Sequence, residues 1–177
     1  CSTISAPINV TVKPVPLAKV VAGGPLTFCA GKNVLLRATT GTGYTYQWKR
    51  GGVDIAGATL SNYYASTTGY YAVVVSNTSG CSTTSETLTV VVKPLPLATI
   101  TPIGSTTICM GKNVLLRASS GPNYTYQWKW GATPIVGAVQ STYAASKPGY
   151  YTVIVTNATG CSVTSPAIPV IVKPLPA

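Results

Sequence analysis

Apolar and polar residues alternate over several short stretches of the chain, which is the pattern of β-strands buried on one face. In residues 44–49, the aromatic side chains fall on one face and the Thr, Gln and Lys side chains on the other. Residues 69–77 and 86–92 predict two further strands, and residues 77–80 supply the hairpin turn between them. No long stretch has the 3.6-residue period of an amphipathic helix, so we expect an all-β fold.

The pattern occurs twice, with a spacing of 80 residues. GKNVLLRA is found at 31–38 and 111–118, and YTYQWK at 44–49 and 124–129. About seven short strands in each repeat, separated by turn signals, favour a β-sandwich. The sequence therefore predicts two tandem β-sandwich domains.

The predicted domain boundaries follow a proline-rich segment, Lys-Pro-Val/Leu-Pro, which recurs at 13–16, 93–96 and 173–176. Residues 17–94 are expected to form domain 1, and residues 95–177 domain 2. Residues 1–16 match the end of each repeat, so they are expected to be the terminal strand and linker of a preceding repeat. Short Pro-rich linkers cannot be helical and favour polyproline II, which predicts a stiff, extended rod of domains.

Residues 1–16 allow two interpretations. A terminal strand without its neighbours exposes unpaired backbone groups, as expected for a piece cut from a longer protein. Alternatively, the strand completes a neighbouring chain by strand addition, which would join copies into a homopolymer.

The strand and turn motifs resemble a known family. Gly69-x-Tyr71-x-Val73-x-Val75-x-Asn77-x-x-Gly80 resembles strand F and the F–G turn of intermediate-set immunoglobulin domains. Gly31-x-x-Val34-x-Leu36-x-Ala38, followed by Trp48, resembles strand B and the core Trp of strand C. The second repeat matches at Gly111, Leu116, Ala118, Trp128, Gly149, Tyr151, Val153, Val155, Asn157 and Gly160. The resemblance implies core positions for Trp48 and Trp128. It also implies tyrosine corners at Tyr71 and Tyr151, whose hydroxyls bond to nearby backbone.

The sequence departs from that family at the inter-sheet disulfide. The two usual cysteine positions hold Ala38 and Val73 in the first repeat, and Ala and Val again in the second. The cysteines stand instead before strand B and after the F–G turn. This placement is similar to immunoglobulin-like repeats in large surface proteins of Bacteroidetes, including gliding adhesins and polysaccharide-degrading proteins exported by the type IX pathway. The resemblance implies an extracellular or cell-surface location.

The five cysteines keep the period of the repeat and indicate disulfides formed in an oxidising compartment. One pairing joins Cys29 to Cys81 and Cys109 to Cys161, and leaves Cys1 without an upstream partner. In the family register these partners lie about 30 Å apart, whereas a disulfide needs α-carbons within about 7 Å. Either strands A and B depart from that register, or Cys29 pairs with Cys161 across the joint between the domains, or the thiols are free. A metal site is not expected, since the chain has no His and no CxxC spacing.

The chain lacks the residues of most catalytic sites. Its carboxylate side chains are Asp54 and Glu86, both in the first repeat. Paired carboxylates therefore cannot form within the second repeat, and the chain has no His for a nucleophile–His arrangement. No Gly-rich phosphate loop and no apolar run long enough to span a membrane are present. We expect no enzymatic activity, no cofactor and no membrane insertion.

Two features are candidates for ligand contact. Trp130 follows the core residue Trp128 by two positions, where the first repeat has Arg50. It either stacks on a sugar or on another protein, or caps the lower core. Basic residues recur at equivalent positions and give a net charge of +10; they are Lys32/Lys112, Arg37/Arg117 and Lys49/Lys129. They either solvate the strand faces or bind polysaccharide or another acidic surface polymer through many weak contacts. No nucleic-acid-binding motif is present, so nucleic acid is not an expected partner.

These observations predict a non-catalytic stalk or adhesive repeat region of a longer surface or secreted protein, in contact with neighbouring repeats. The two alternatives are a carbohydrate-binding module attached to a polysaccharide-active protein and a filament subunit joined by strand exchange.

Overall fold

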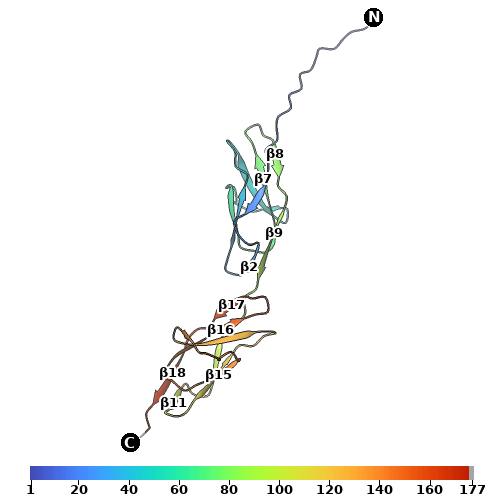
Figure 1. Cartoon of the computed structure of the whole chain (residues 1–177). Coiled ribbons are helices and arrows are strands. Elements are labelled where there is room, and N and C mark those ends of the chain that lie inside the picture. Colours follow the sequence, from blue (N-terminus) through green and yellow to red (C-terminus); the bar gives the residue numbers. More distant parts are fainter. Residues whose placement is uncertain (176–177) are drawn as a thin grey trace. The chain divides into compact units, whose positions relative to one another are not determined.

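The structure is a computed structural model that describes residues 1–175. Residues 176 and 177 lie outside this range. They are the last two residues of the predicted domain 95–177, and residue 176 is also the last of the segment 173–176. The chain divides into two compact units, Cys1–Val92 and Lys93–Ala177. Every regular element of the described residues is a strand (Figure 1), so the all-β prediction is confirmed. Among these residues no helix is long and apolar enough to cross a membrane.

Unit 1 is a sandwich of two sheets. The smaller sheet has the order β1 (Val20–Ala22), β3 (Val34–Ala38) and β6 (Asn62–Ala65). The larger sheet has the order β2 (Thr27–Cys29), β9 (Leu88–Lys93), β7 (Gly69–Ser76), β4 (Thr45–Arg50) and β5 (Val53–Asp54), and β8 (Ser82–Thr84) also pairs with β7. Two facing sheets let each bury the apolar side of its alternating strands.

Unit 2 repeats this topology strand for strand. Its smaller sheet consists of β10 (Ile100–Ile103), β12 (Val114–Ala118) and β15 (Thr142–Ala145). Its larger sheet has the order β11 (Thr107–Cys109), β18 (Ile168–Lys173), β16 (Gly149–Thr156), β13 (Thr125–Trp130) and β14 (Thr133–Pro134), and β17 (Ser162–Thr164) also pairs with β16. The chain thus consists of two immunoglobulin-like β-sandwich units.

The core of unit 1 is held by apolar packing where most immunoglobulin domains have a disulfide. Ala38 and Val73 are both buried, and Trp48 is fully buried between the sheets. The Trp48 indole donates a hydrogen bond to the carbonyl of Leu60 at 2.8 Å, so its polar atom is satisfied. Unit 2 has the same arrangement, with the Trp128 indole bonded to the Gln140 carbonyl at 2.9 Å.

A row of three aromatic rings extends from each core Trp. In unit 1, Tyr63 lies with its ring centroid 5.8 Å from those of both Trp48 and Tyr71. The Tyr71 hydroxyl donates to the backbone carbonyl of Thr67 at 2.9 Å. In unit 2 the Tyr151 hydroxyl donates to the Lys147 carbonyl at 3.0 Å. Each hydroxyl thereby ties the end of one strand to the loop before it.

The last strand of each sandwich is interrupted by a buried serine. Between β8 and β9, the Ser85 hydroxyl accepts a hydrogen bond from Val73 N–H at 3.0 Å and donates to the Glu86 carbonyl at 2.8 Å. Ser165 repeats both bonds in unit 2. The hydroxyl satisfies a buried backbone donor that the interrupted strand leaves unpaired.

Residues 1–16 form no strand, although they match the sequence of β8 and β9. The apolar side chains of Ile4, Ile8, Val10 and Val12 are exposed. In unit 1 the matching strand β9 pairs with β7 and β2. Residues 1–16 have no such neighbours among the described residues, so they form no ladder.

Candidate functional site

The turn between β16 and β17 holds the polypeptide that leads into unit 2. Asn157 begins this turn, and its Oδ1 accepts hydrogen bonds from the backbone N–H groups of Thr159 at 3.1 Å and Cys161 at 3.0 Å. These bonds orient the amide so that Nδ2 donates to the carbonyl of Pro94 at 2.9 Å. Lys93 adds a bond from its Nζ to the Thr159 carbonyl at 3.1 Å.

Unit 1 has the same contacts. Asn77 Oδ1 accepts from the N–H groups of Ser79 and Cys81, and its Nδ2 donates to the Pro14 carbonyl at 2.9 Å. Lys13 Nζ donates to the Ser79 carbonyl at 3.3 Å. We call this arrangement the linker clamp: the turn Asn, the Lys-Pro segment that it binds and the turn carbonyl that binds the Lys.

The linker clamp suits a Lys-Pro segment chemically. Proline has no N–H group, and a polyproline II backbone makes no internal hydrogen bonds, so its carbonyls remain available to an external donor. The side-chain amide of Asn offers an acceptor and a donor at once. It can therefore stabilise its own turn and bind the linker with the same group.

The cysteines divide into two classes. Cys29 and Cys161 are disulfide-bonded. Cys1, Cys81 and Cys109 carry free thiols, of which those of Cys1 and Cys109 are exposed. The predicted pairs within each domain, Cys29 with Cys81 and Cys109 with Cys161, are therefore not formed in the structure.

The register of the larger sheet in unit 2 gives the physical reason. β11 pairs with β18 in parallel, so that Cys109 lies opposite Lys173. Cys161 precedes β17, whose residue Ser162 lies opposite Thr156 at the far end of β16. About ten strand residues separate these two levels, which corresponds to about 30 Å and exceeds the reach of a disulfide.

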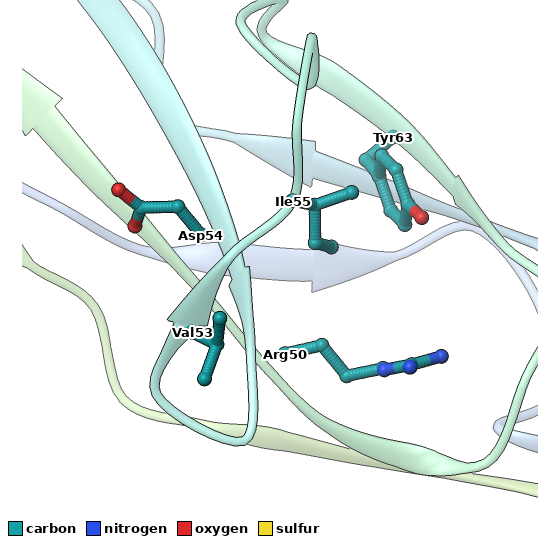
Figure 2. Close-up of a pocket in the computed structure, with 5 residues that line it drawn as sticks. All are labelled: Arg50, Val53, Asp54, Ile55 and Tyr63. Atoms are coloured by element: carbon teal, nitrogen blue, oxygen red, sulfur yellow. The ribbon is translucent and has the colours of Figure 1, made fainter.

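A shallow pocket of about 230 Å³ opens beside β4 and β5 in unit 1, lined by Arg50, Val53, Asp54, Ile55 and Tyr63 (Figure 2). The Arg50 guanidinium donates to the Thr67 hydroxyl at 2.5 Å. Burial raises the pKa of the Tyr63 hydroxyl, with a further increase from Tyr71 and an opposing effect of Arg50. In Figure 2 the Asp54 carboxylate points away from Arg50 and Tyr63, so the pocket does not bring an acid and a base together.

Trp130 lies at the equivalent place in unit 2, beside a smaller pocket of about 110 Å³. Its indole N–H donates to the Pro148 carbonyl at 3.1 Å, and Lys147 Nζ lies 5.6 Å from its ring centroid. The side chain is 43% exposed. Its polar atom is therefore bonded within unit 2 while part of the ring stays exposed, and ligand contact at Trp130 stays a prediction.

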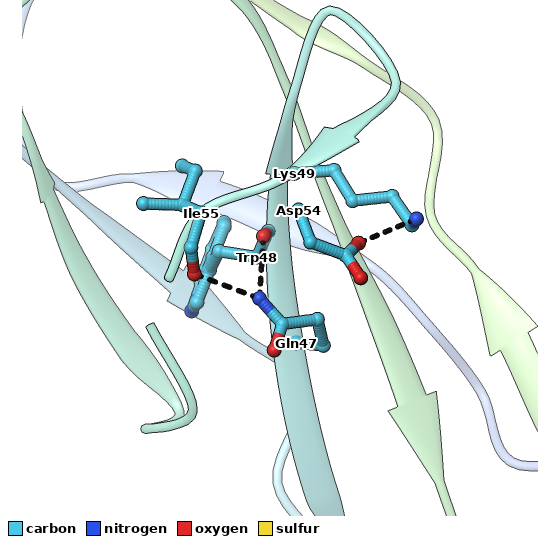
Figure 3. A network of polar contacts seen from close by, with 5 residues as sticks. All are labelled: Gln47, Trp48, Lys49, Asp54 and Ile55. Atoms are coloured by element: carbon cyan, nitrogen blue, oxygen red, sulfur yellow. Dashed lines mark hydrogen bonds and ion pairs between the residues drawn. The ribbon is translucent and has the colours of Figure 1, made fainter. Parts of the chain in front are cut away.

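The polar network around β4 stabilises the turn to β5 (Figure 3). Gln47 Nε2 donates to the carbonyls of Trp48 and Ile55, both at 2.9 Å, and Lys49 forms an ion pair with Asp54 at 2.6 Å. In unit 2 Gln127 makes both equivalent hydrogen bonds, whereas Pro134 replaces the carboxylate opposite Lys129. One of the two carboxylate side chains of the protein thus has a structural partner.

The repeated basic residues do not share one strand or one sheet. Lys32 follows β2 in a turn, Arg37 lies on β3 of the smaller sheet, and Lys49 lies on β4 of the larger sheet. Within residues 1–175, no three His, Cys, Asp or Glu side chains gather as they would around a metal ion. Binding of an acidic polymer stays a prediction.

Sequence reasoning missed the linker clamp and the buried serines. The clamp had a signal, because the Asn of the turn and the Lys-Pro segment 63 residues before it recur together with the period of the repeat. The buried serines had a weaker sequence signal. Ser is common in turns, and a single sequence does not indicate which Ser hydroxyl is buried.

Residues 16–94 match the family model described as "Ig-like domain CHU_C associated", which covers unit 1 from its linker to its last strand. Unit 2 repeats the motifs and strand order of that unit. None of the curated proteins matches the sequence.

Several solved structures resemble the chain at low identity. Murine CEACAM1b is 15% identical, over 88% of this chain and 98% of that one, with a TM-score of 0.40. An I-band fragment from titin is 16% identical, over 89% and 64%, with a TM-score of 0.38. The Bacteroides ovatus glucan-utilisation protein SGBP-B, in complex with a mixed-linkage heptasaccharide, is 16% identical, over 87% and 47%, with a TM-score of 0.34. These values are too low to carry an inference about ligand or role.

Proposed function

We propose that the chain is a non-catalytic stalk of a secreted or surface-anchored protein, in which tandem immunoglobulin-like units act as a stiff rod in adhesion or presentation. The observation that carries this proposal is the linker clamp, which both units make with the same residue types and the same 2.9 Å bond. A domain that served only as a ligand platform would not need to bind the segment leading into it.

The clamp supports stiffness because it removes freedom that the prolines leave. The ring of Pro94 fixes its own φ, but its ψ and the φ and ψ angles of the neighbouring residues can still vary. The bond from Asn157 to the Pro94 carbonyl and the bond from Lys93 to Thr159 fasten this segment to unit 2 at two points.

We further propose that Cys29 and Cys161 bond to each other across the joint. Both are disulfide-bonded, whereas the other three cysteines are free. In unit 2, Cys109, the counterpart of Cys29, lies opposite Lys173 of a Lys-Pro segment. Lys93 in turn binds Thr159, two residues before Cys161. These contacts support a disulfide at the clamp.

A disulfide is typical of proteins that fold in an oxidising compartment, which supports an extracellular location. The family match of unit 1 agrees with a surface protein. The more specific context, a protein of Bacteroidetes exported by the type IX pathway, belongs to the proposal and rests on the sequence motifs.

Small-angle X-ray scattering of the full chain tests the proposal. The oxidised protein is compared with the reduced Asn157→Asp variant, in which Oδ1 can still accept the turn bonds but the donor to Pro94 is lost. We expect a narrow distribution of the radius of gyration for the oxidised protein and a broad one for the reduced variant. Asn62→Asp, at an exposed position on β6, controls for the added charge. An equally broad distribution in the oxidised protein would contradict a stiff stalk.

A further inference from the structure

We infer that Cys109 and the segment Lys173–Pro174 form one half of a repeat-to-repeat joint, and that Cys81 and the Asn77 turn form the complementary half. Each half fits a further repeat of the same pattern, joined by a clamp and a disulfide. The inference rests on the proposed stalk function and identifies the partner of its two ends.

The first half is assembled at one end of the larger sheet of unit 2. Cys109 lies opposite Lys173 in the parallel ladder of β11 and β18, and the Met110 N–H donates to the Lys173 carbonyl at 2.9 Å. A free, exposed thiol therefore stands beside an exposed Lys-Pro segment. Nothing within the core of unit 2 requires a cysteine at this position.

The second half is the turn of unit 1. Asn77 and Ser79 provide the donor and the carbonyl that bind a Lys-Pro segment, here Lys13–Pro14. The free thiol of Cys81 lies in the same place, with its Sγ 4.0 Å from the Lys13 carbonyl. The turn thus offers a thiol next to the site where a Lys-Pro segment docks.

The equivalent cysteines provide the independent observation. Cys29 is the counterpart of Cys109, and Cys161 is the counterpart of Cys81, at spacings of 80 residues. Both counterparts are disulfide-bonded, so each position type can form a disulfide when a partner is present. In unit 2, whose turn cysteine Cys161 is disulfide-bonded, the linker clamp binds Lys93–Pro94. This segment is equivalent to Lys173–Pro174.

The chemistry is a thiol–disulfide exchange with a small-molecule disulfide such as oxidised glutathione as the oxidant. One thiol loses its proton, and its thiolate attacks the glutathione disulfide and releases one glutathione thiolate. The second protein thiol, also deprotonated, attacks the mixed disulfide and releases the second. Two protein thiols are oxidised to one disulfide, and one glutathione disulfide is reduced to two glutathione molecules that take up the two protons.

The test is a chain with one more repeat, in which residues 97–177 are copied after Pro176. The copy carries Cys109→Ser, so that the natural Cys109 is the one observed, and Ser162→Thr at an exposed position, which changes the mass of the copy's Cys161 peptide. The chain is oxidised in a glutathione buffer, alkylated and mapped by mass spectrometry without reduction. We expect Cys109 to be found linked to Cys161 of the added copy, while Cys81 remains alkylated. Recovery of alkylated Cys109 from a chain whose added repeat has a native near-ultraviolet circular dichroism spectrum would overturn the inference.

A second chain tests the other half and guards against misfolding of the first. It consists of residues 1–96 followed by residues 17–177, so that a copy of unit 1 precedes the natural one. The first copy carries Cys81→Ser, so that a single Cys81 remains, and Thr27→Ser at an exposed position, which changes the mass of its Cys29 peptide. We expect Cys81 of the second copy to be linked to Cys29 of the first, and an alkylated Cys81 in this folded chain would equally overturn the inference. Asn157→Asp in the added repeat of the first chain should slow formation of its disulfide by about 2-fold to 10-fold, whereas Asn62→Asp should not.

The outcome for the joint is separable from that for the stalk. If Cys109 remains free but scattering from the longer chain still gives a narrow distribution, the stalk is retained and the joint at Cys109 is wrong. If both the disulfide is absent and the distribution is broad, both proposals fail.

Discussion

The side-chain amide of Asn157 donates a hydrogen bond to the carbonyl of Pro94, 63 residues earlier in the chain, at 2.9 Å. The same residue types make the same bond in unit 1. Because the contact recurs with the period of the sequence, it is a property of the repeat and not of one copy. It also explains why an Asn stands at the start of a turn where several other residues would suffice for the turn alone.

Loss of the amide donor should loosen the linker without unfolding the unit. In Asn157→Asp the two backbone bonds to Oδ1 can persist, while the bond to Pro94 is lost, so we expect faster motion of residues 95–97. The measurement is the ¹⁵N–¹H heteronuclear NOE, which should fall at Leu95 and Leu97 and stay constant in the strands. An unchanged NOE in the linker would show that the bond does not restrain it.

Removal of a buried serine hydroxyl should destabilise its unit. Ser85→Ala leaves the Val73 N–H buried without an acceptor, which costs about 1–3 kcal/mol of unfolding free energy. Ser165→Ala should cost the same in unit 2. Urea unfolding measures both, and Ser82→Ala, at an exposed position on β8, is the matched control. Equal stability of Ser85→Ala and Ser82→Ala would contradict the role assigned to the hydroxyl.

The two equivalent glycines at the start of β7 and β16 should differ in their tolerance of a side chain. Gly149 has a φ of 142°, and a Cβ there would lie 2.3 Å from the Trp130 indole nitrogen. At Gly69 the Cβ would meet Arg50 Cγ at 2.8 Å, and a flexible Arg can move aside. We expect Gly149→Ala to lose about 1–3 kcal/mol of unfolding free energy and Gly69→Ala to lose less. Equal losses in thermal or urea unfolding would count against the packing described for Trp130.

Alkaline pH should destabilise the protein through Tyr63 and Tyr151. Burial raises the pKa of Tyr63 above its usual value of about 10. The unfolded state then loses its proton at lower pH than the folded state, so stability is fully present below about pH 10 and falls as pH rises through the folded pKa. Burial likewise raises the pKa of Tyr151, with the same sign.

The measurement is the urea midpoint between pH 8 and pH 11, with the free thiols alkylated to prevent disulfide exchange. Tyr63→Phe should flatten the alkaline decrease, whereas Tyr64→Phe, at an exposed position, should leave it unchanged. The same slope in both variants would show that ionisation of Tyr63 does not contribute.

Much of the fold follows from the sequence because short-range patterns determine it. The alternation in residues 44–49 and 69–77 places Trp48, Tyr71 and Val73 on buried faces, and all three are buried. The 80-residue repeat transfers each such conclusion to unit 2. The motif also implied that the Tyr71 hydroxyl bonds to nearby backbone, and the Thr67 carbonyl accepts that bond.

The interrupted last strand and the state of the cysteines did not follow from the sequence. The pattern of residues 86–92 predicts one strand, which is β9 in the structure. It does not predict the short strand β8 before it, or the Ser85 side chain that bonds to β7 between the two strands. Cysteine spacing gives positions but no distances. The family register already placed Cys109 and Cys161 at opposite ends of the sandwich, and the parallel pairing of β11 with β18 supplies the register in this protein.

Peptide mass spectrometry of the unreduced, alkylated protein tests the central claim most directly. If the units are joined at the clamp, a proteolytic digest will contain one disulfide-linked peptide pair, Cys29 with Cys161, and Cys1, Cys81 and Cys109 will carry the alkyl group. A digest containing Cys29 linked to Cys81, or Cys109 linked to Cys161, would mean that each unit is closed on itself, and it would contradict the jointed stalk.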